Sequence, residues 1–130
     1  MNARLQAPTL AAARVLMALI FVLSGVSKIG AADAIRGYME SMGVPGALLW
    51  PTIAFEVGAG LLIVLGYRTR VVAQLLAGFC LLTAAIIHHH FADQIQMIMF
   101  LKNLSMAGGF LLLSAAGPGT VSLDARTGRA

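Results

Sequence analysis

Charged residues and cysteine are scarce in this sequence. Asp, Glu, Lys and Arg make up 11% of its 130 residues and hydrophobic residues make up 59%, whereas an ordinary soluble domain has about 25% charged and roughly 45–50% apolar residues. This composition is typical of an integral membrane protein and excludes a large water-soluble domain. Cys80 is the single cysteine, so the chain can form neither an intramolecular disulfide nor a CxxC pair. Thiol exchange by a dithiol within this chain is therefore excluded.

Acidic residues are also few, and the formal net charge is +4. A basic protein can bind nucleic acid, but here most Lys and Arg residues lie near the ends of apolar segments and form no basic stripe. We therefore expect no nucleic-acid partner and interpret these charges as determinants of membrane topology. The consecutive histidines His88, His89 and His90 lack the Cys/His spacing of a metal site, so no metal is expected.

Four apolar stretches are each long enough to cross a hydrocarbon core of roughly 30 Å. They cover residues 9–30, 46–66, 71–91 and 96–116, with bounds good to a few residues. The first is longer than the apolar region of a signal peptide, so we expect it to be retained as a helix. The short link 67–70 makes the second and third helices antiparallel neighbours. The sequence thus predicts an all-α, integral membrane four-helix bundle with up-and-down topology, in which residues 1–130 form a single transmembrane domain.

The distribution of basic residues predicts that both termini are cytoplasmic. In that orientation five arginines face the cytoplasm, and only Lys28 and Arg36 face the outside, in agreement with the positive-inside rule. The five are Arg4, Arg68, Arg70, Arg126 and Arg129. The lipid bilayer is therefore the expected surroundings of most of the chain.

Residues 31–43 lie outside in this topology and separate into an apolar and a polar face at 100° per residue. The apolar face holds Ile35, Tyr38, Met39 and Met42. This pattern predicts a short interfacial helix, stopped by Gly43 and Pro45, that lies over the outer mouth of the bundle. The alternative is an ordinary surface helix packed on its neighbours.

Arg14, Glu56 and Lys102 lie inside three different predicted spans. A charge at the membrane centre costs roughly 2.5–3.5 kcal/mol, so these groups are expected to face one another or a wet cavity. Either Lys102 or Arg14 would then be the partner of Glu56. Lys28 and His88 end their helices on the outer side. We expect Lys28 to snorkel to the membrane surface, and His88 to form interfacial hydrogen bonds rather than to ligate a metal or haem.

At 100° per residue, each predicted helix has one stripe of polar or small residues. The stripes run through Arg14, Ala18, Phe21, Gly25 and Lys28; through Thr52, Glu56, Gly60 and Ile63; through Gln74, Ala77, Leu81, Ala85 and His88; and through Met99, Lys102, Asn103, Met106, Gly109 and Leu113. Four such stripes predict a bundle that surrounds a polar axis.

Two interpretations of this axis are open. In the functional one, a pocket opens outward with Glu56 as proton acceptor or hydrogen-bonding anchor, and its wall is positively charged. In the structural one, Glu56 pairs with a cation only to neutralise buried charge and to fix the helix register. The candidate site residues are Glu56, Lys102, His88, Arg14, Lys28 and Asn103.

The ordered set of polar landmarks resembles the DoxX family. The likeness covers nearly the whole chain and rests on Arg14, Ser24-Gly25-Val26-Ser27-Lys28, Gly43-Val44-Pro45, Glu56, Gly66-Tyr67-Arg68-Thr69-Arg70, His88, Lys102-Asn103-Leu104, Gly117-Pro118-Gly119 and Ser122-Leu123-Asp124. The family consists of small four-helix membrane proteins of bacteria and archaea, so the resemblance implies a bacterial inner-membrane location. Its landmark positions fall here on Arg14, Lys28, Glu56, His88, Lys102, Asn103 and Asp124.

The resemblance also implies a role near quinone chemistry. The family takes its name from a subunit associated with thiosulfate:quinone oxidoreductase, and relatives are linked to membrane oxidoreductase complexes of thiol and oxidative-stress defence. No flavin, haem or iron site is recognisable in this sequence, so the chain is expected to be an accessory or quinone-interacting subunit with redox partner subunits or further copies of itself, and no complete enzyme alone. The alternative is a non-catalytic membrane scaffold or assembly factor in which the buried ion pair is structural.

Overall fold

The computed structural model describes residues 2–129, and within them it contains helices and no strand. Four helices are long and apolar enough to cross a membrane. These are α1 (Ala3–Gly30), α3 (Leu49–Leu65, preceded by the 3₁₀ turn Gly46–Leu48), α4 (Thr69–Ile87) and α5 (Gln94–Ala116). Two short helices, α2 (Ala32–Ser41) and α6 (Leu123–Arg126), complete the chain. The predicted all-α class with four long apolar helices is confirmed.

The helices begin and end where local residues supply the missing hydrogen bonds. The side chain of Asn2 accepts from the backbone N–H of Arg4, so α1 begins at Ala3, several residues before the predicted start. Asp93 accepts from Ile95 in the same way and starts α5. Gly66, with φ of 71°, ends α3 in the left-handed conformation that glycine adopts without strain.

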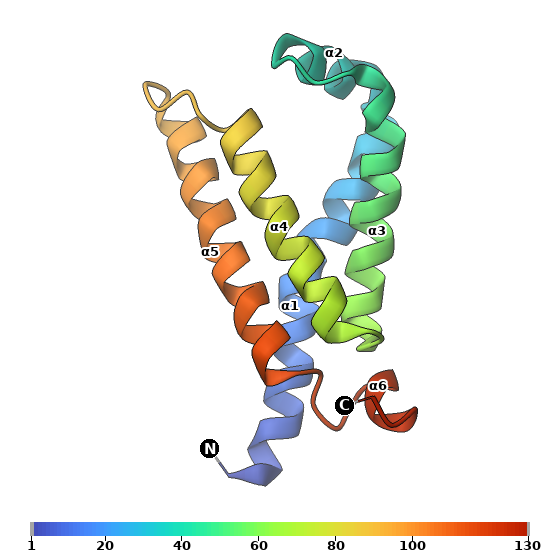
Figure 1. The fold of residues 1–130 in the computed structure, drawn as a ribbon. Coiled ribbons are helices and arrows are strands. Elements are labelled where there is room, and N and C mark those ends of the chain that lie inside the picture. The colour runs from blue at the N-terminus through green and yellow to red at the C-terminus, as the bar shows by residue number, and fades with distance from the viewer. Residues whose placement is uncertain (1, 130) are drawn as a thin grey trace.

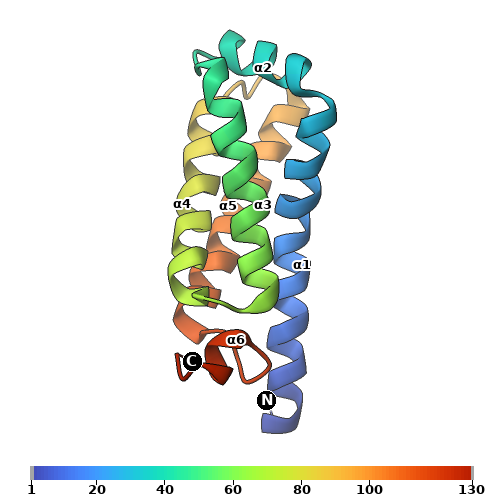
Figure 2. The ribbon, with the colours of Figure 1, turned by 90° about the vertical axis from the view of Figure 1, so that its right-hand side faces the viewer.

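The helices form two pairs that diverge toward one end of the molecule. Helix α1 packs along α3, and α4 packs along α5, while contacts between the pairs are fewer. Figure 1 shows the pairs close together near the two chain ends and further apart near α2. Viewed from the side in Figure 2, α2 lies across the top of the bundle and α6 lies below it. We refer to these as the α2 end and the terminal end.

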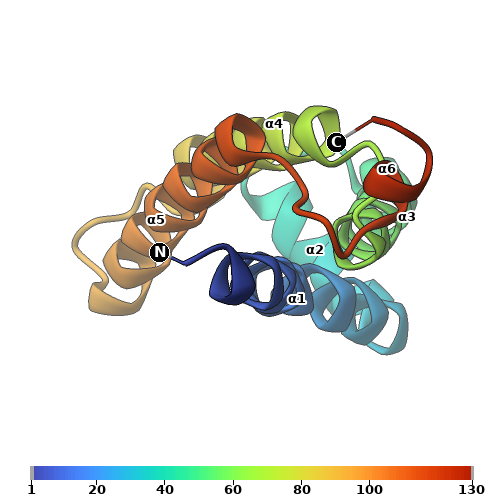
Figure 3. The same cartoon turned by 90° about the horizontal axis from the view of Figure 1, so that it is seen from below.

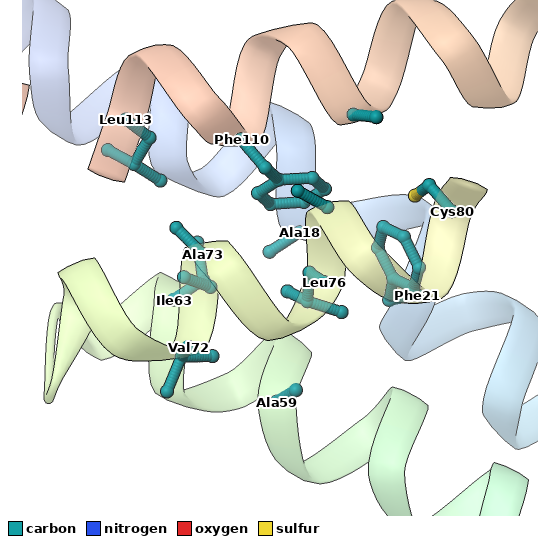
Figure 4. Close-up of a cluster of buried hydrophobic side chains, with 12 residues drawn as sticks. Ala18, Phe21, Ala59, Ile63, Val72, Ala73, Leu76, Cys80, Phe110 and Leu113 are labelled. Atoms are coloured by element: carbon teal, nitrogen blue, oxygen red, sulfur yellow. The ribbon is translucent and has the colours of Figure 1, made fainter. Parts of the chain in front are cut away.

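The apolar core lies in the half of the bundle nearer the terminal end. Its residues come from all four long helices, and Phe21 and Phe110 are its largest buried side chains (Figure 4). The rings of Phe21 and Phe110 meet edge to face with their centroids 5.5 Å apart. Because this core joins the two pairs here, they are free to diverge toward α2.

Both chain ends lie at the same end of the molecule, as the view from below shows (Figure 3). Residues 117–122 connect α5 to α6, which lies under the end of α3. Helix α2 has formed where the sequence predicts a short helix, and it is followed by Gly43 with φ of 80°. Its contact with a membrane surface, like the cytoplasmic location of the chain ends, stays a prediction.

Candidate functional site

The candidate site is an ion pair between α1 and α3, in the diverging half of the bundle. The Nζ atom of Lys28 lies 2.6 Å from one carboxylate oxygen of Glu56 and 2.7 Å from the other. The Glu56 side chain is only 6% exposed, whereas that of Lys28 is 22% exposed. The buried carboxylate is thus neutralised, while the side chain of Lys28 remains partly accessible.

Small residues let the two helices come close enough for this pair. A Cβ atom added at Gly25 would lie 2.6 Å from the Cγ2 atom of Val57, and one added at Gly60 would lie 2.8 Å from the Cγ2 atom of Val22. Real side chains do not tolerate such distances, so glycine is required at both positions for this packing. Gly25 and Gly60 therefore set the separation of α1 and α3 at which Lys28 reaches Glu56.

The prediction that Lys102 or Arg14 pairs with Glu56 is wrong. Lys102 is exposed on α5 and has no ion-pair partner among residues 2–129. The buried face of α5 runs through Ala107 and Phe110, and Lys102 lies about 140° around the helix from Ala107. Lys102 and Met99 of the predicted stripe are therefore exposed, whereas Met106 packs against the core and Leu113 belongs to it.

The direction of each side chain along its helix explains the actual pairing. Side chains tilt toward the N-terminus of their own helix. Lys28, two residues before the end of α1, therefore points back into the bundle toward Glu56. Lys102 points toward the α2 end, because α5 starts there. This directional rule can be applied to the sequence alone and would have favoured Lys28.

The Arg14 side chain lies at the terminal end of the bundle and caps the C-terminus of α3. Its guanidinium donates to the carbonyls of Ile63 and Val64 at 3.2 and 3.1 Å, and to the carbonyl of Val121 in the C-terminal segment. Helix ends leave such carbonyls without intrahelical partners and with partial negative charge. Arg14 is thus buried as a helix cap, and its Nε atom has no hydrogen-bond partner within residues 2–129.

Asp124 ties the C-terminal segment to the turn between α3 and α4. Its carboxylate accepts from the backbone N–H groups of Arg68 and Thr69 at 2.7 and 2.8 Å. Burial acts to raise the pKa of Asp124, but the hydrogen bonds from Thr69 and Arg68 and the charge of Arg129 outweigh it, so the pKa lies below the ordinary 3.8. Asp124 therefore stays ionised and caps α4 from a distant part of the chain. The resemblance named this residue, but the sequence pattern alone gave it no role.

His88 and Asn103 take part in separate polar contacts. His88 bonds through Nδ1 to Gln96 Oε1 at 2.9 Å, and the Gln96 amide donates to the hydroxyl of Tyr38 on α2 at 3.3 Å. Asn103 donates to Thr83 at 3.0 Å, between α5 and α4. His88 thus forms the kind of hydrogen bond that the sequence predicts, and neither residue is bonded to the Lys28–Glu56 pair. Within residues 2–129, no cluster of three or more His, Cys, Asp or Glu side chains could hold a metal.

Two hollows lie at the terminal end, away from the ion pair. One of about 390 Å³ is lined by parts of α1, α3 and the C-terminal segment and includes Arg14 and Arg126. The other, of about 300 Å³, is lined by parts of α1 and of residues 116–120 and includes Arg70. Arg70 donates to the carbonyls of Ser114 and Ala115, so it caps α5 as Arg14 caps α3.

Comparison with known proteins identifies close relatives. The sequence model of the DoxX family matches residues 9–89, more than half of the chain. The inner membrane protein YqjF of Escherichia coli (strain K12) is 47% identical over 112 residues, which cover 86% of either chain. The inner membrane protein YphA of the same organism is 45% identical over 121 residues, 88% of this chain and 86% of the relative. No solved structure matches the chain significantly.

Proposed function

Because the chain belongs to the DoxX family of inner-membrane proteins, we propose that it is an accessory subunit of a membrane redox system that binds a quinone-type molecule beside Lys28 and Glu56. The observation that supports this proposal is the ion pair itself. It joins a carboxylate that is 6% exposed to an ammonium group that is 22% exposed, within helices long and apolar enough to span a membrane. An ionisable group inside a membrane is a candidate functional site by default.

The donor and acceptor chemistry of the pair suits a quinone. A quinone presents two carbonyl oxygens, which accept hydrogen bonds, on an apolar molecule that is soluble in lipid. Lys28 has three N–H donors and directs two contacts to Glu56, so one donor is left for a ligand oxygen. If a ligand draws Lys28 away, the Glu56 carboxylate becomes a base that can take up a proton. The chain would thus bind the ligand and hold a proton, while electrons come from a partner subunit.

Quinone binding is tested on the full chain in lipid nanodiscs, titrated with a short-chain ubiquinone. We expect saturable binding that weakens about tenfold or more in Lys28→Met and Glu56→Gln, since each loses a charged hydrogen-bonding group. Lys102→Met is the matched control, because it removes an equal charge from an exposed position away from the pair, and it should bind as the original chain does. Absence of saturable binding in a folded preparation, or equal affinity in all four proteins, would overturn the proposal.

A second candidate is a scaffold or assembly factor in which the ion pair only holds α1 against α3. It is favoured by the fact that both carboxylate oxygens of Glu56 are already bonded, and that neither hollow at the terminal end includes this residue. In this case Glu56→Gln lowers the melting temperature without removing a ligand. Affinity purification under native conditions then recovers a constant partner protein with both the original chain and the variant.

We also propose that the terminal end is cytoplasmic. Besides Arg14, five arginines belong to this end, namely Arg4, Arg68, Arg70, Arg126 and Arg129, in keeping with the positive-inside rule. Labelling of intact cells with a membrane-impermeant maleimide should modify Gly37→Cys and spare Thr120→Cys, both in a Cys80→Ala background. The two positions are exposed, in α2 and in the C-terminal segment respectively. The reverse labelling pattern would invert the orientation.

A further inference from the structure

The larger hollow at the terminal end combines apolar walls with positive charge. Its walls include Val15 of α1 and Val64 and Leu65 of α3, and its lining also includes Arg14 and Arg126. Its volume of about 390 Å³ falls in the range of small-molecule sites. We infer that this hollow binds one anionic phospholipid, with the phosphate at Arg126 and the first part of an acyl chain along Val15 and Leu65.

Charge selects an anionic ligand. Among residues 2–129, the lining contains two guanidinium groups and no carboxylate. Asp124, which is close by in sequence, is buried and accepts from two backbone N–H groups of the α3–α4 turn. Arg126 is exposed, and its side chain has no hydrogen bond or ion pair with any residue in the described range 2–129. Its guanidinium can therefore form the charged, bidentate contact that a phosphate accepts.

Arg14 provides a second, independent indication. Its side chain is 2% exposed, and its terminal nitrogens are directed to carbonyls of α3 and of the C-terminal segment. Its Nε atom, however, is buried without an acceptor in residues 2–129, and leaving a buried donor unpaired costs about 1–3 kcal/mol. The Nε atom is closed to solvent, so a lipid oxygen becomes its acceptor only when the Arg14 side chain shifts toward the hollow that it lines.

The position of the hollow favours a lipid over free phosphate. Helix α3 ends at Leu65 and the polar turn with Arg68 follows, so the boundary between the apolar span and water lies at this level. Val15 and Leu65 are 40% and 52% exposed and continue the apolar surface from the hollow along α1 and α3. An inorganic anion gains nothing from these walls, whereas a phospholipid places its phosphate and its acyl chain at this boundary.

The smaller hollow at the terminal end differs from the proposed lipid site in the arginine that lines it. It includes Arg70, but that guanidinium is directed to the carbonyls of Ser114 and Ala115. No second arginine lines it. Only the larger of the two thus offers an arginine side chain that no described residue engages.

The test is native mass spectrometry of the full chain in mild detergent, with dioctanoyl phosphatidylglycerol and dioctanoyl phosphatidylcholine as probes. We expect phosphatidylglycerol to bind about tenfold more tightly, and Arg126→Gln to remove most of this preference. Arg129→Gln is the matched control, since it removes the same charge from the same segment but its guanidinium lies over the ring of Tyr67, 5.4 Å from the centroid. It should change the affinity less than about twofold.

Three results would overturn the inference: equal binding of the two lipids, equal effects of Arg126→Gln and Arg129→Gln, or displacement of the lipid by inorganic phosphate at similar concentration. The last result would identify a simple anion site. Arg126 is exposed, so its replacement should leave the fold intact, which circular dichroism checks. Quinone binding at the α2 end should be unaffected by Arg126→Gln, so failure of either proposal can be recognised separately.

Discussion

The α1–α3 pair carries an ion pair and two glycines that each lie close to the facing helix, whereas the side-chain hydrogen bonds between α4 and α5 are neutral, from Asn103 to Thr83 within the helices and between His88 and Gln96 at their α2 end. In the first, Lys28 and Glu56 meet across a seam that Gly25 and Gly60 keep narrow. In the second, Asn103 donates to Thr83. The first pair therefore depends on electrostatic neutralisation and the second on apolar packing. A substitution that removes such a contact should lower the free energy of unfolding much more in α1–α3 than in α4–α5.

Helix capping, by contrast, is shared by the two pairs. Arg14 of α1 caps α3, and Arg70 of α4 caps α5, each by donating to two carbonyls in the last turn of its partner helix. A guanidinium suits this task because it carries several donors and stays charged. The difference between the pairs thus lies in the span and at the α2 end, which is where the candidate site lies.

The largest effect is expected from Lys28→Met. It leaves the Glu56 carboxylate buried without a cation, so the free energy of unfolding should fall by about 3 kcal/mol, at the low end for a buried pair because Lys28 is partly exposed. Glu56→Gln combined with Lys28→Met should recover much of this loss. Unfolding of the single and double variants in mixed micelles gives the coupling energy.

Lys102→Met is the control for that cycle. Its ammonium group is exposed and makes no ion pair within residues 2–129, and a charge inside a span is itself costly, so its removal should not lower the unfolding free energy. A strong coupling of Lys102 with Glu56, together with none between Lys28 and Glu56, would reverse the assignment of the pair.

The next largest effect on stability is expected at the turn between α3 and α4, which connects the two helix pairs. Asp124→Ala removes the acceptor for the N–H groups of Arg68 and Thr69 and should cost about 2 kcal/mol, the upper range for a helix N-cap, because the site is buried. Thermal melts in detergent measure it. Asp33→Ala is a suitable control, because that side chain is fully exposed and its contact with Arg36 is a surface pair.

The same carboxylate predicts a pH dependence. The folded pKa of Asp124 is below its ordinary value of 3.8, so its contribution to stability is complete above the unfolded pKa and is lost as the pH falls through the folded pKa. This group should leave the melting temperature unchanged from pH 7 to about pH 5 and lower it below about pH 4. Asp124→Asn should reduce this fall of the melting temperature at acid pH, the acid limb of the stability profile. An unchanged acid limb in the variant would show that other groups determine it.

Gly25→Ala tests the narrow seam of α1–α3. The added methyl group would meet the stiff, branched side chain of Val57 at 2.6 Å, and such overpacking costs about 1–3 kcal/mol. Gly78→Ala on α4 is the matched control, since nothing lies within 4 Å of its added Cβ. It should be neutral or slightly stabilising, because alanine is the better helix former. Equal losses at the two positions would remove the contrast between the pairs.

The sequence predicted the buried faces of α1 and α3 better than those of α4 and α5. On α1 the predicted stripe contains Arg14, Ala18, Phe21 and Gly25, and these are the buried residues of that helix. Polar and small residues mark one side of α1 clearly, so its phase could be assigned. On α3 the prediction of Glu56, Gly60 and Ile63 is confirmed for the same reason.

Helix α4 has only Gln74 and Thr83 as polar residues after its first turn, and there the prediction largely failed, since Ala77 alone of the predicted stripe is buried. The predicted stripe includes Gln74, Leu81 and Ala85, which are exposed. The buried residues instead include Leu76, Cys80 and Ala84. In lipid an apolar side chain has little preference between the core and the bilayer, so hydropathy does not define which face is buried. The partner of Glu56 and the capping roles of Arg14 and Arg70 likewise depend on side-chain direction and distant chain segments, which periodicity does not describe.

The smallest effect is expected at the polar contact of the α4–α5 pair. Asn103→Leu removes the hydrogen bond to Thr83 but leaves Thr83 satisfied, because its hydroxyl also donates to the carbonyl of Phe79 at 2.9 Å. Side-chain hydrogen bonds between membrane helices average about 0.6 kcal/mol, and the added apolar contact offsets part of that. The variant should therefore unfold within about 1 kcal/mol of the original chain in the same mixed-micelle titration. A loss as large as that of Lys28→Met would mean that the neutral contact holds its pair as strongly as the ion pair holds α1 to α3, and the contrast drawn between the two pairs would be lost.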